Sequence, residues 1–199
     1  MSNSQIIGIT GGIGTGKSYV GNIIRSLGFL VLDSDKIAHD VLNENKVIEI
    51  IENNFGAEVL TENGLINRKA LGNIVFKNSL KLSLLNHLLD PYLRSAIINQ
   101  LKVASKPVFI EIQLLYEQHY EEYLDQVIVI YADNQTAANR IQERDHVNLD
   151  FAKKKISSQM PISEKIKKAD YVIDTTKNNV KEQVIDFLNK IDLLKVNKE

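Results

Sequence analysis

The chain has 199 residues, of which 44% are hydrophobic, and its 24 basic and 25 acidic residues leave a formal charge of −1. This composition is typical of one globular domain, and it argues against a nucleic-acid partner. No apolar run is long enough to span a membrane and no signal-peptide pattern is present, so we expect a cytoplasmic protein without membrane association. The sequence has no cysteine and four scattered histidines, which excludes disulfides and a thiolate zinc site and gives no sign of a histidine metal cluster.

The first predicted element is a buried strand over Ile6–Thr10, and a glycine-rich segment follows it directly. Residues 11–18 read G-G-I-G-T-G-K-S and match the phosphate-loop pattern G-x-x-x-x-G-K-[ST]. Glycines let successive backbone N–H groups approach an anion, and the helix predicted from Tyr19 to Leu27 adds its positive dipole. Lys17 should reach the β- and γ-phosphates, and Ser18 should hold Mg²⁺. The residues expected to bind nucleotide here are Gly11, Gly12, Ile13, Gly14, Thr15, Gly16, Lys17, Ser18 and Tyr19.

The second predicted strand, Phe29–Leu32, is followed by Asp33-Ser34-Asp35. Open α/β sheets bind their ligands at the carboxyl ends of the strands, so one of these carboxylates lies where it could orient or deprotonate an acceptor hydroxyl. We assign that chemistry to Asp33. Ser34 or Asp35 precedes an apolar helical pattern and is predicted to cap the helix.

Helical signals fill most of residues 34–105. They include Leu80–Leu89 and a second helix over Tyr92–Val103, which Pro91 is predicted to open as a first-turn proline. Such an insertion either covers a bulky substrate or only buries the sheet, and periodicity alone leaves both interpretations open.

Three more strands are predicted at Val108–Ile112, Val127–Tyr131 and Tyr171–Ile173. The alternation of strands and helices predicts an α/β fold, with a parallel sheet of about five strands and helices on both faces. We divide this single unit, residues 1–199, into a core (1–33, 106–138 and 169–192), a helical substrate-binding region (34–105) and a lid (139–168).

The predicted lid is rich in positive charge, with eight basic residues against four acidic ones. Because arginines stabilise charge on a transferring phosphoryl group, we predict functional roles for Arg140 and Arg144. For Lys153–Lys155 we favour a solvated helix face. The basic residues are Arg140, Arg144, Lys153, Lys154, Lys155, Lys165, Lys167 and Lys168.

Further segments match a single family in order and spacing, and together they span nearly the whole chain. They are V-L-D-S-D around Asp33, Phe55-Gly56, G-L-I-N-R-K-A-L from Gly64 with Val75-Phe76, Leu85-Asn86 with Pro91, L-L-Y-E from Leu114, Gln135 with Arg140 and Arg144, Ser158-Gln159-Met160, and Lys165-x-x-x-Ala169-Asp170. With the phosphate loop, they make the sequence resemble the dephospho-coenzyme A kinase family.

This resemblance implies a P-loop NTPase-type α/β fold with a helical substrate-binding insertion and a lid. The activity implied is transfer of the ATP γ-phosphate to the ribose 3′-hydroxyl of dephospho-coenzyme A, the last step of coenzyme A biosynthesis. ATP and Mg²⁺ are the expected cofactors, with no obligate protein partner. The expected site comprises catalytic Lys17, Asp33 and Arg140, nucleotide-binding Arg144, substrate-binding Asp33, Asn86, Leu115 and Glu117, and metal-binding Ser18 and Glu111.

The chain departs from the family pattern at four positions. Glu111 stands where the family has aspartate, and Gln113 stands where it has proline. Asp90 replaces a common histidine, and Asp174, followed by Thr175, stands where an asparagine is common after the last strand. A carboxylate remains at residue 111, one methylene longer than in the family.

Two alternative functions remain open at this point. One is another P-loop small-molecule kinase, of the nucleoside or shikimate type, because the phosphate loop alone does not distinguish acceptors. The other is a nucleotide switch, because Asn189-Lys190-Ile191-Asp192 fits the guanine-reading pattern N-K-x-D. We interpret that match as accidental, since it lies within an amphipathic helical pattern and not at a strand end.

Overall fold

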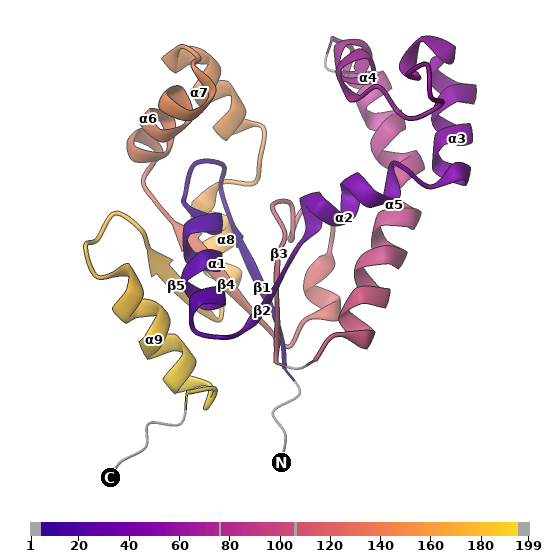
Figure 1. The fold of residues 1–199 in the computed structure, drawn as a ribbon. Helices are drawn as coiled ribbons and strands as arrows, with labels where there is room; N and C mark the ends of the chain where they lie inside the picture. The colour runs from indigo at the N-terminus through magenta and orange to yellow at the C-terminus, as the bar shows by residue number, and fades with distance from the viewer. Residues whose placement is uncertain (1–4, 76, 106, 195–199) are drawn as a thin grey trace. The chain divides into compact units, whose positions relative to one another are not determined.

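A computed structural model describes residues 5–75, 77–105 and 107–194. Phe76, which belongs to one of the segments matched to the family, lies outside these residues. So do residues 1, 106 and 199, at which limits of the predicted regions fall. The chain forms two compact units, which Figure 1 shows by element: a sheet unit of residues 1–33 and 104–199, and a helical unit of residues 34–103. The finer division into core, substrate region and lid stays a prediction.

The sheet unit contains a five-stranded, fully parallel sheet, as predicted. Its strands are β1 (Ile6–Gly11), β2 (Leu30–Asp33), β3 (Val108–Glu111), β4 (Gln126–Tyr131) and β5 (Tyr171–Asp174). They lie in the order β2-β3-β1-β4-β5. Since β1 is central, the glycine-rich loop that follows it emerges at the middle of the sheet's carboxyl edge, where open α/β sheets bind ligands.

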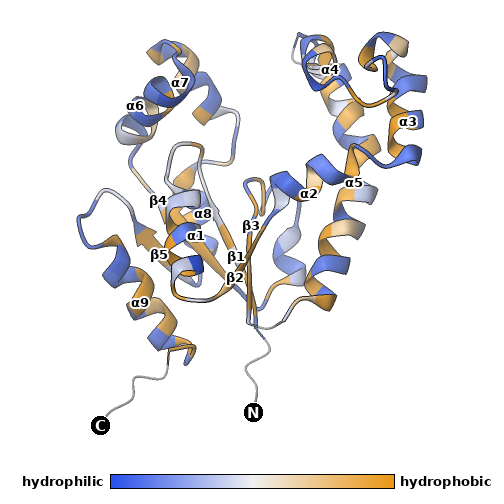
Figure 2. Ribbon diagram, viewed as in Figure 1, coloured by the Kyte–Doolittle hydropathy of each residue, from blue (hydrophilic) through white to orange (hydrophobic). Residues whose placement is uncertain are grey.

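Helices of the sheet unit cover the strands and extend beyond them. They are α1 (Lys17–Ser26), α6 (Asn134–Asp145), α7 (Leu149–Ser157), α8 (Ile162–Lys168) and α9 (Val180–Lys190), with a short 3₁₀ turn, η2 (Tyr120–Tyr123). Helices α1 and α9 contact each other over one core that includes Ile7, Ile9 and Phe109. Figure 2 shows the strands as the most hydrophobic segments of this unit, as expected for a sheet buried on both faces.

The helical unit is organised around its longest helix, α5 (Ser79–Val103). Around it lie α2 (Ser34–Val41), α3 (Asn45–Phe55) and α4 (Arg68–Val75), each in contact with α5, and the 3₁₀ turn η1 (Ala57–Val59). A leucine and an isoleucine on opposite sides of residue 91, Leu85 and Ile97, are both buried. The unit therefore has a core of its own.

The predicted break at Pro91 is wrong, because α5 runs through the proline without interruption. A proline inside a helix removes one hydrogen bond and crowds the preceding turn. Buried contacts from both halves of α5 offset this cost. Asp90 and Arg94 also form an (i, i+4) ion pair across the proline, with 3.2 Å between Oδ1 and Nη2. Among the described residues, no helix has the length and apolar character needed to cross a membrane.

Candidate active site

The phosphate loop has the strand-loop-helix geometry that its pattern predicts. Gly14 and Gly16 take positive φ values of 78° and 92°, which glycine adopts without strain. A side chain at Gly14 would place its Cβ 2.5 Å from the carbonyl oxygen of Ala137. Gly16 precedes α1 and supplies no side-chain cap. The first N–H groups of α1 and its positive dipole can therefore serve an anion.

Lys17 folds back over this loop. Its Nζ donates to the carbonyl oxygens of Gly11 at 3.3 Å and Gly12 at 3.2 Å. Buried Thr15 fixes the turn, because its Oγ1 donates to the Gly12 carbonyl at 2.8 Å. Ser18 follows Lys17 as an exposed residue of the first helical turn. The next residue, Tyr19, is 57% exposed.

Arg140 lies against the same loop, although it is far away in sequence. Its Nη1 donates to the Gly14 carbonyl at 3.4 Å and to Thr175 Oγ1 at 2.9 Å, and its Nη2 donates to the Thr175 carbonyl at 3.0 Å. Thr175 Oγ1 also donates to the Thr15 carbonyl at 2.7 Å. The structure thus brings predicted Arg140 to the phosphate loop through Thr175, to which the sequence analysis assigned no role.

Local capping sets the position of Arg140 on α6. The helix begins after Asp133, whose Oδ1 accepts from the Thr136 backbone N–H at 2.9 Å. This hydrogen bond is the main cause that lowers the pKa of Asp133, so its carboxylate remains a charged N-cap at neutral pH.

Arg144 differs from Arg140, because it pairs with its neighbour. Its Nε and Nη2 lie 2.7 and 3.1 Å from the two carboxylate oxygens of Asp145, and Lys155 Nζ lies 2.9 Å from Oδ2. The Arg144 hydrogen bond, reinforced by Lys155, holds the pKa of Asp145 well below its usual range. Lys155 therefore belongs to an ion-pair cluster between α6 and α7, whereas the sequence favoured a solvated face. A nucleotide contact from Arg144 stays a prediction.

Asp33 and Glu111 end neighbouring strands and are paired in the β2–β3 register. Glu111 is buried, and its Oε1 accepts from Arg25 Nη2 of α1 at 2.9 Å. Helix α2 begins at Ser34, so Ser34 and Asp35 lie within its first turn and not at its cap. The prediction that one of these two residues caps α2 from outside the helix is therefore wrong.

The three other predicted substrate residues have different environments. Asn86 is exposed on α5 in the helical unit. Leu115 follows β3 and is fully buried, where its Cδ1 would lie 2.8 Å from a Cβ at Gly8. Glu117 forms an ion pair with Lys165, at 2.9 Å, and accepts from the Met160 N–H at 3.0 Å. Their roles toward substrate stay predictions.

Lys165, one of the eight basic residues of the predicted lid, does not lie on the surface. Its side chain is fully buried on α8, and Nζ donates to the Gln113 carbonyl at 3.0 Å in addition to its Glu117 contact. Neighbouring Tyr116 further holds α8, since its hydroxyl donates to the Lys168 carbonyl at 3.0 Å. Burial raises the pKa of Tyr116 to about 12, so the phenol remains a donor at neutral pH.

A cavity of about 570 Å³ lies beside the start of α6 and the connection between α7 and α8. Its size is within the range of ligand pockets. Gln135 and Lys153 supply polar groups to its wall, and Met160 and Ile162 supply apolar ones. Gln159 also lines it, and Gln159 Oε1 accepts from the Ile13 N–H of the phosphate loop at 2.9 Å. One side chain, Gln159, therefore links the wall of the cavity to the phosphate loop.

The guanine-reading match has no structural support. Asn189 and Lys190 are the last residues of α9, so the match lies at a helix end and not after a strand, as expected for an accidental pattern.

A phosphate loop after the central strand of a parallel sheet, with a lysine and an arginine against it, defines a P-loop kinase. A shikimate kinase from Acinetobacter baumannii shares this fold, with a TM-score of 0.53 and 18% identity over 97% of this chain and 96% of that chain.

Comparisons with closer proteins narrow the class. Residues 5–182 match the family described as dephospho-CoA kinase. The dephospho-CoA kinase of Fusobacterium nucleatum is 40% identical, over 87% of this chain and 91% of its own length. A solved dephospho-CoA kinase from Campylobacter jejuni has a TM-score of 0.67 and 34% identity, covering 94% of this chain and 97% of its own. The chain belongs to the dephospho-coenzyme A kinase family.

Proposed function

We infer that the chain is an enzyme of coenzyme A biosynthesis that transfers phosphate from ATP to dephospho-coenzyme A, at the ribose 3′-hydroxyl. Family membership supports the reaction, and the likeness to shikimate kinase supports the fold alone. The structural observation that supports this chemistry is that Lys17 and Arg140 both contact the phosphate loop.

Phosphoryl transfer asks mainly for positioning and charge stabilisation. In our proposal the loop amides and the α1 N-terminus bind the β- and γ-phosphates, while Lys17 neutralises their negative charge. Arg140 approaches the same charge from α6. Asp33 accepts the hydrogen bond of the 3′-hydroxyl and orients it for attack, because carboxylate oxygens are hydrogen-bond acceptors.

The side chains that we propose for Mg²⁺ offer oxygen donors, namely the Ser18 hydroxyl and the Glu111 carboxylate. Mg²⁺ prefers oxygen donors and is commonly held by one or two carboxylates together with substrate phosphates. We assign Ser18 and Glu111 to this role, with Arg25 contacting one oxygen of Glu111. When bound, Mg²⁺ supplies positive charge to the β- and γ-phosphates.

The acceptor is the property to test first. ADP should form much faster with dephospho-coenzyme A than with shikimate, uridine, AMP or no acceptor, because family membership points to this acceptor. A coupled assay of ADP release across the panel measures it. Equal rates with all acceptors would contradict the proposal and restore the alternative of another small-molecule kinase.

A second expectation concerns the lid. Arg140 and the Arg144–Asp145–Lys155 cluster lie on the α6–α7 pair, so closure over the phosphates should slow amide exchange there. We expect slower hydrogen exchange over residues 139–157 with an ATP analogue and dephospho-coenzyme A than without ligands. Helix α9, which is the partner in none of the hydrogen bonds given above for Arg140, Arg144 and Lys155, serves as the internal reference. Unchanged exchange in 139–157 would indicate that the segment is a static, solvated surface.

A further inference from the structure

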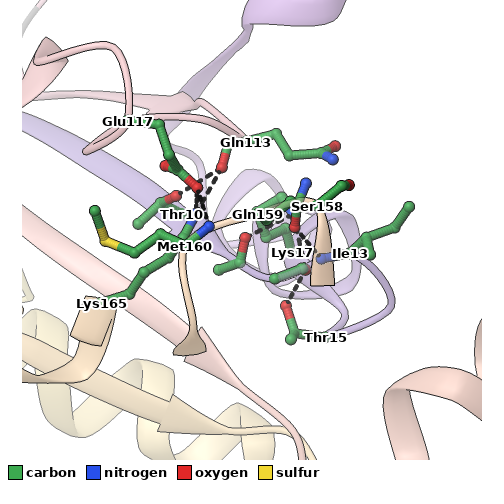
Figure 3. A network of polar contacts seen from close by, with 12 residues as sticks. Thr10, Ile13, Thr15, Lys17, Gln113, Glu117, Ser158, Gln159, Met160 and Lys165 are labelled. Atoms are coloured by element: carbon green, nitrogen blue, oxygen red, sulfur yellow. Dashed lines mark hydrogen bonds and ion pairs between the residues drawn. The ribbon is translucent and has the colours of Figure 1, made fainter. Parts of the chain in front are cut away.

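The four residues that join α7 to α8, residues 158–161, form a segment that we call the strap. Figure 3 shows that the strap lies between the phosphate loop and the segment after β3. On one side, Gln159 Oε1 accepts from Ile13 N of the loop at 2.9 Å. On the other side, Met160 N donates to Glu117 Oε1 at 3.0 Å. Two adjacent residues thus tie the end of α7 to two separate parts of the sheet unit.

The Glu117 side of the strap is anchored by a buried charge. Lys165 is fully buried, and its Nζ is 2.9 Å from Glu117 Oε1 and 3.0 Å from the Gln113 carbonyl. The same carbonyl accepts from Thr10 Oγ1 at 3.3 Å, one residue before the phosphate loop begins. A buried ammonium group is stable only when it is paired and hydrogen-bonded. This network therefore holds the Glu117 side chain in one position. Fixing Glu117 fixes Met160 and, through the chain, Gln159.

Gln159 acts on the loop itself. The Ile13 N–H is a donor, so the side-chain oxygen of Gln159 faces it. Ile13 occupies the third position of the phosphate loop, between glycines that give the backbone little stiffness of its own. A hydrogen bond from outside the loop therefore restricts the orientation of this peptide.

We propose that Gln159 is a positioning residue for phosphoryl transfer, which holds the Ile13 peptide of the phosphate loop in its binding orientation, and that the buried Glu117–Lys165 pair acts through Gln159. The proposal rests on the proposed kinase function for its kinetic part. It gives Glu117 a role within the protein, where the sequence suggested only a contact with substrate.

The direct test replaces Gln159 with methionine or with glutamate. Gln159→Met keeps the length of the side chain and loses the acceptor, whereas Gln159→Glu keeps an acceptor oxygen. We expect faster amide exchange at Ile13 in Gln159→Met without any ligand, and near wild-type exchange in Gln159→Glu. Turnover of Gln159→Met should fall roughly 3- to 10-fold, because the loss of one hydrogen bond changes a rate by about this factor. The KM for dephospho-coenzyme A and the Tm should change little.

A double-mutant cycle tests whether the buried Glu117–Lys165 pair acts through Gln159. Lys165→Met with Glu117→Gln removes both charges together and keeps an acceptor for the Met160 N–H, which avoids an unpaired buried charge. This pair of changes should lower turnover in the wild-type background and have little further effect in the Gln159→Met background. The exposed pair Lys167–Glu164 on the same helix, 2.7 Å apart, provides the matched control: Lys167→Met should leave turnover unchanged in both backgrounds.

Three outcomes would overturn the proposal: unchanged Ile13 exchange in Gln159→Met, a loss of turnover that follows a loss of Tm, or additive effects of the two sets of changes. The exchange measurement needs no catalysis. If the enzyme shows no preference for dephospho-coenzyme A, the proposed function is wrong. The exchange measurement at Ile13 then still tests the contact between Gln159 and the loop.

Discussion

Lys17→Ala is expected to lower turnover with dephospho-coenzyme A by roughly 100-fold or more, while the fold persists. The amine lies over the phosphate loop, where it donates to the carbonyl oxygens of Gly11 at 3.3 Å and Gly12 at 3.2 Å. Its positive charge therefore lies at the loop that binds phosphates in our proposal. Removal of one oriented electrostatic group from an active site costs about 10²- to 10³-fold in turnover.

The measurement is steady-state ADP release at saturating acceptor, with circular dichroism and Tm as checks of folding. Lys167→Ala is the control, because Lys167 is an exposed lysine on α8 that pairs with Glu164 of the same helix. Near-normal turnover of Lys17→Ala would remove Lys17 from the catalytic assignment. A loss of turnover that comes with unfolding would assign the residue a structural role.

The sheet was predictable because its signals are local. Each strand is a short apolar run, and burial on both faces of a parallel sheet demands such runs. The phosphate loop was predictable for the same reason, since the glycines at 14 and 16 meet a backbone requirement for positive φ that is visible in the sequence itself. The course of α5 was not predictable locally. Pro91 is a strong local signal for a helix start, but packing on both sides of it prevails.

The parts of the site that could not be predicted depend on contacts between distant residues. Lys165 counted as one of eight basic residues of a lid, yet it is fully buried against Glu117, 48 positions earlier in the chain. The contact of Gln159 with Ile13 spans 146 positions. Sequence spacing carries no information about such pairs without the fold. The buried lysine had one indirect signal, namely the Lys165-x-x-x-Ala169-Asp170 segment shared with the family.

The replacement at Gln113 illustrates why a departure from the family pattern is tolerated. The network uses the carbonyl oxygen of this residue, which accepts from Lys165 Nζ and Thr10 Oγ1. A proline would offer the same oxygen, because proline lacks only the backbone N–H. Beside the departure at Asp174, the hydroxyl and carbonyl of Thr175 hold Arg140 against the loop.

Asp33→Asn and Glu111→Gln should affect the reaction in different ways, although the two carboxylates are neighbours in the sheet register. Asp33 is the last residue of β2, and we assign it to the acceptor hydroxyl. Asp33→Asn should lower kcat by roughly 10²- to 10⁴-fold, equal to about 3 to 5 kcal/mol of barrier, and leave the affinity for Mg·ATP nearly intact. Glu111→Gln should instead raise the Mg²⁺ concentration needed for activity.

A Mg²⁺ titration of both variants at saturating dephospho-coenzyme A separates these roles, with nucleotide binding measured in parallel. Arg25 supplies the control for Glu111, since Nη2 of Arg25 lies 2.9 Å from Oε1 and holds the carboxylate in place. If Glu111 serves Mg²⁺, Arg25→Met should shift the Mg²⁺ requirement in the same direction as Glu111→Gln, because the carboxylate loses its orientation. If excess Mg²⁺ restores Asp33→Asn and has no effect on Glu111→Gln, the two roles are reversed, and the carboxylate on β3 is the one that meets the acceptor.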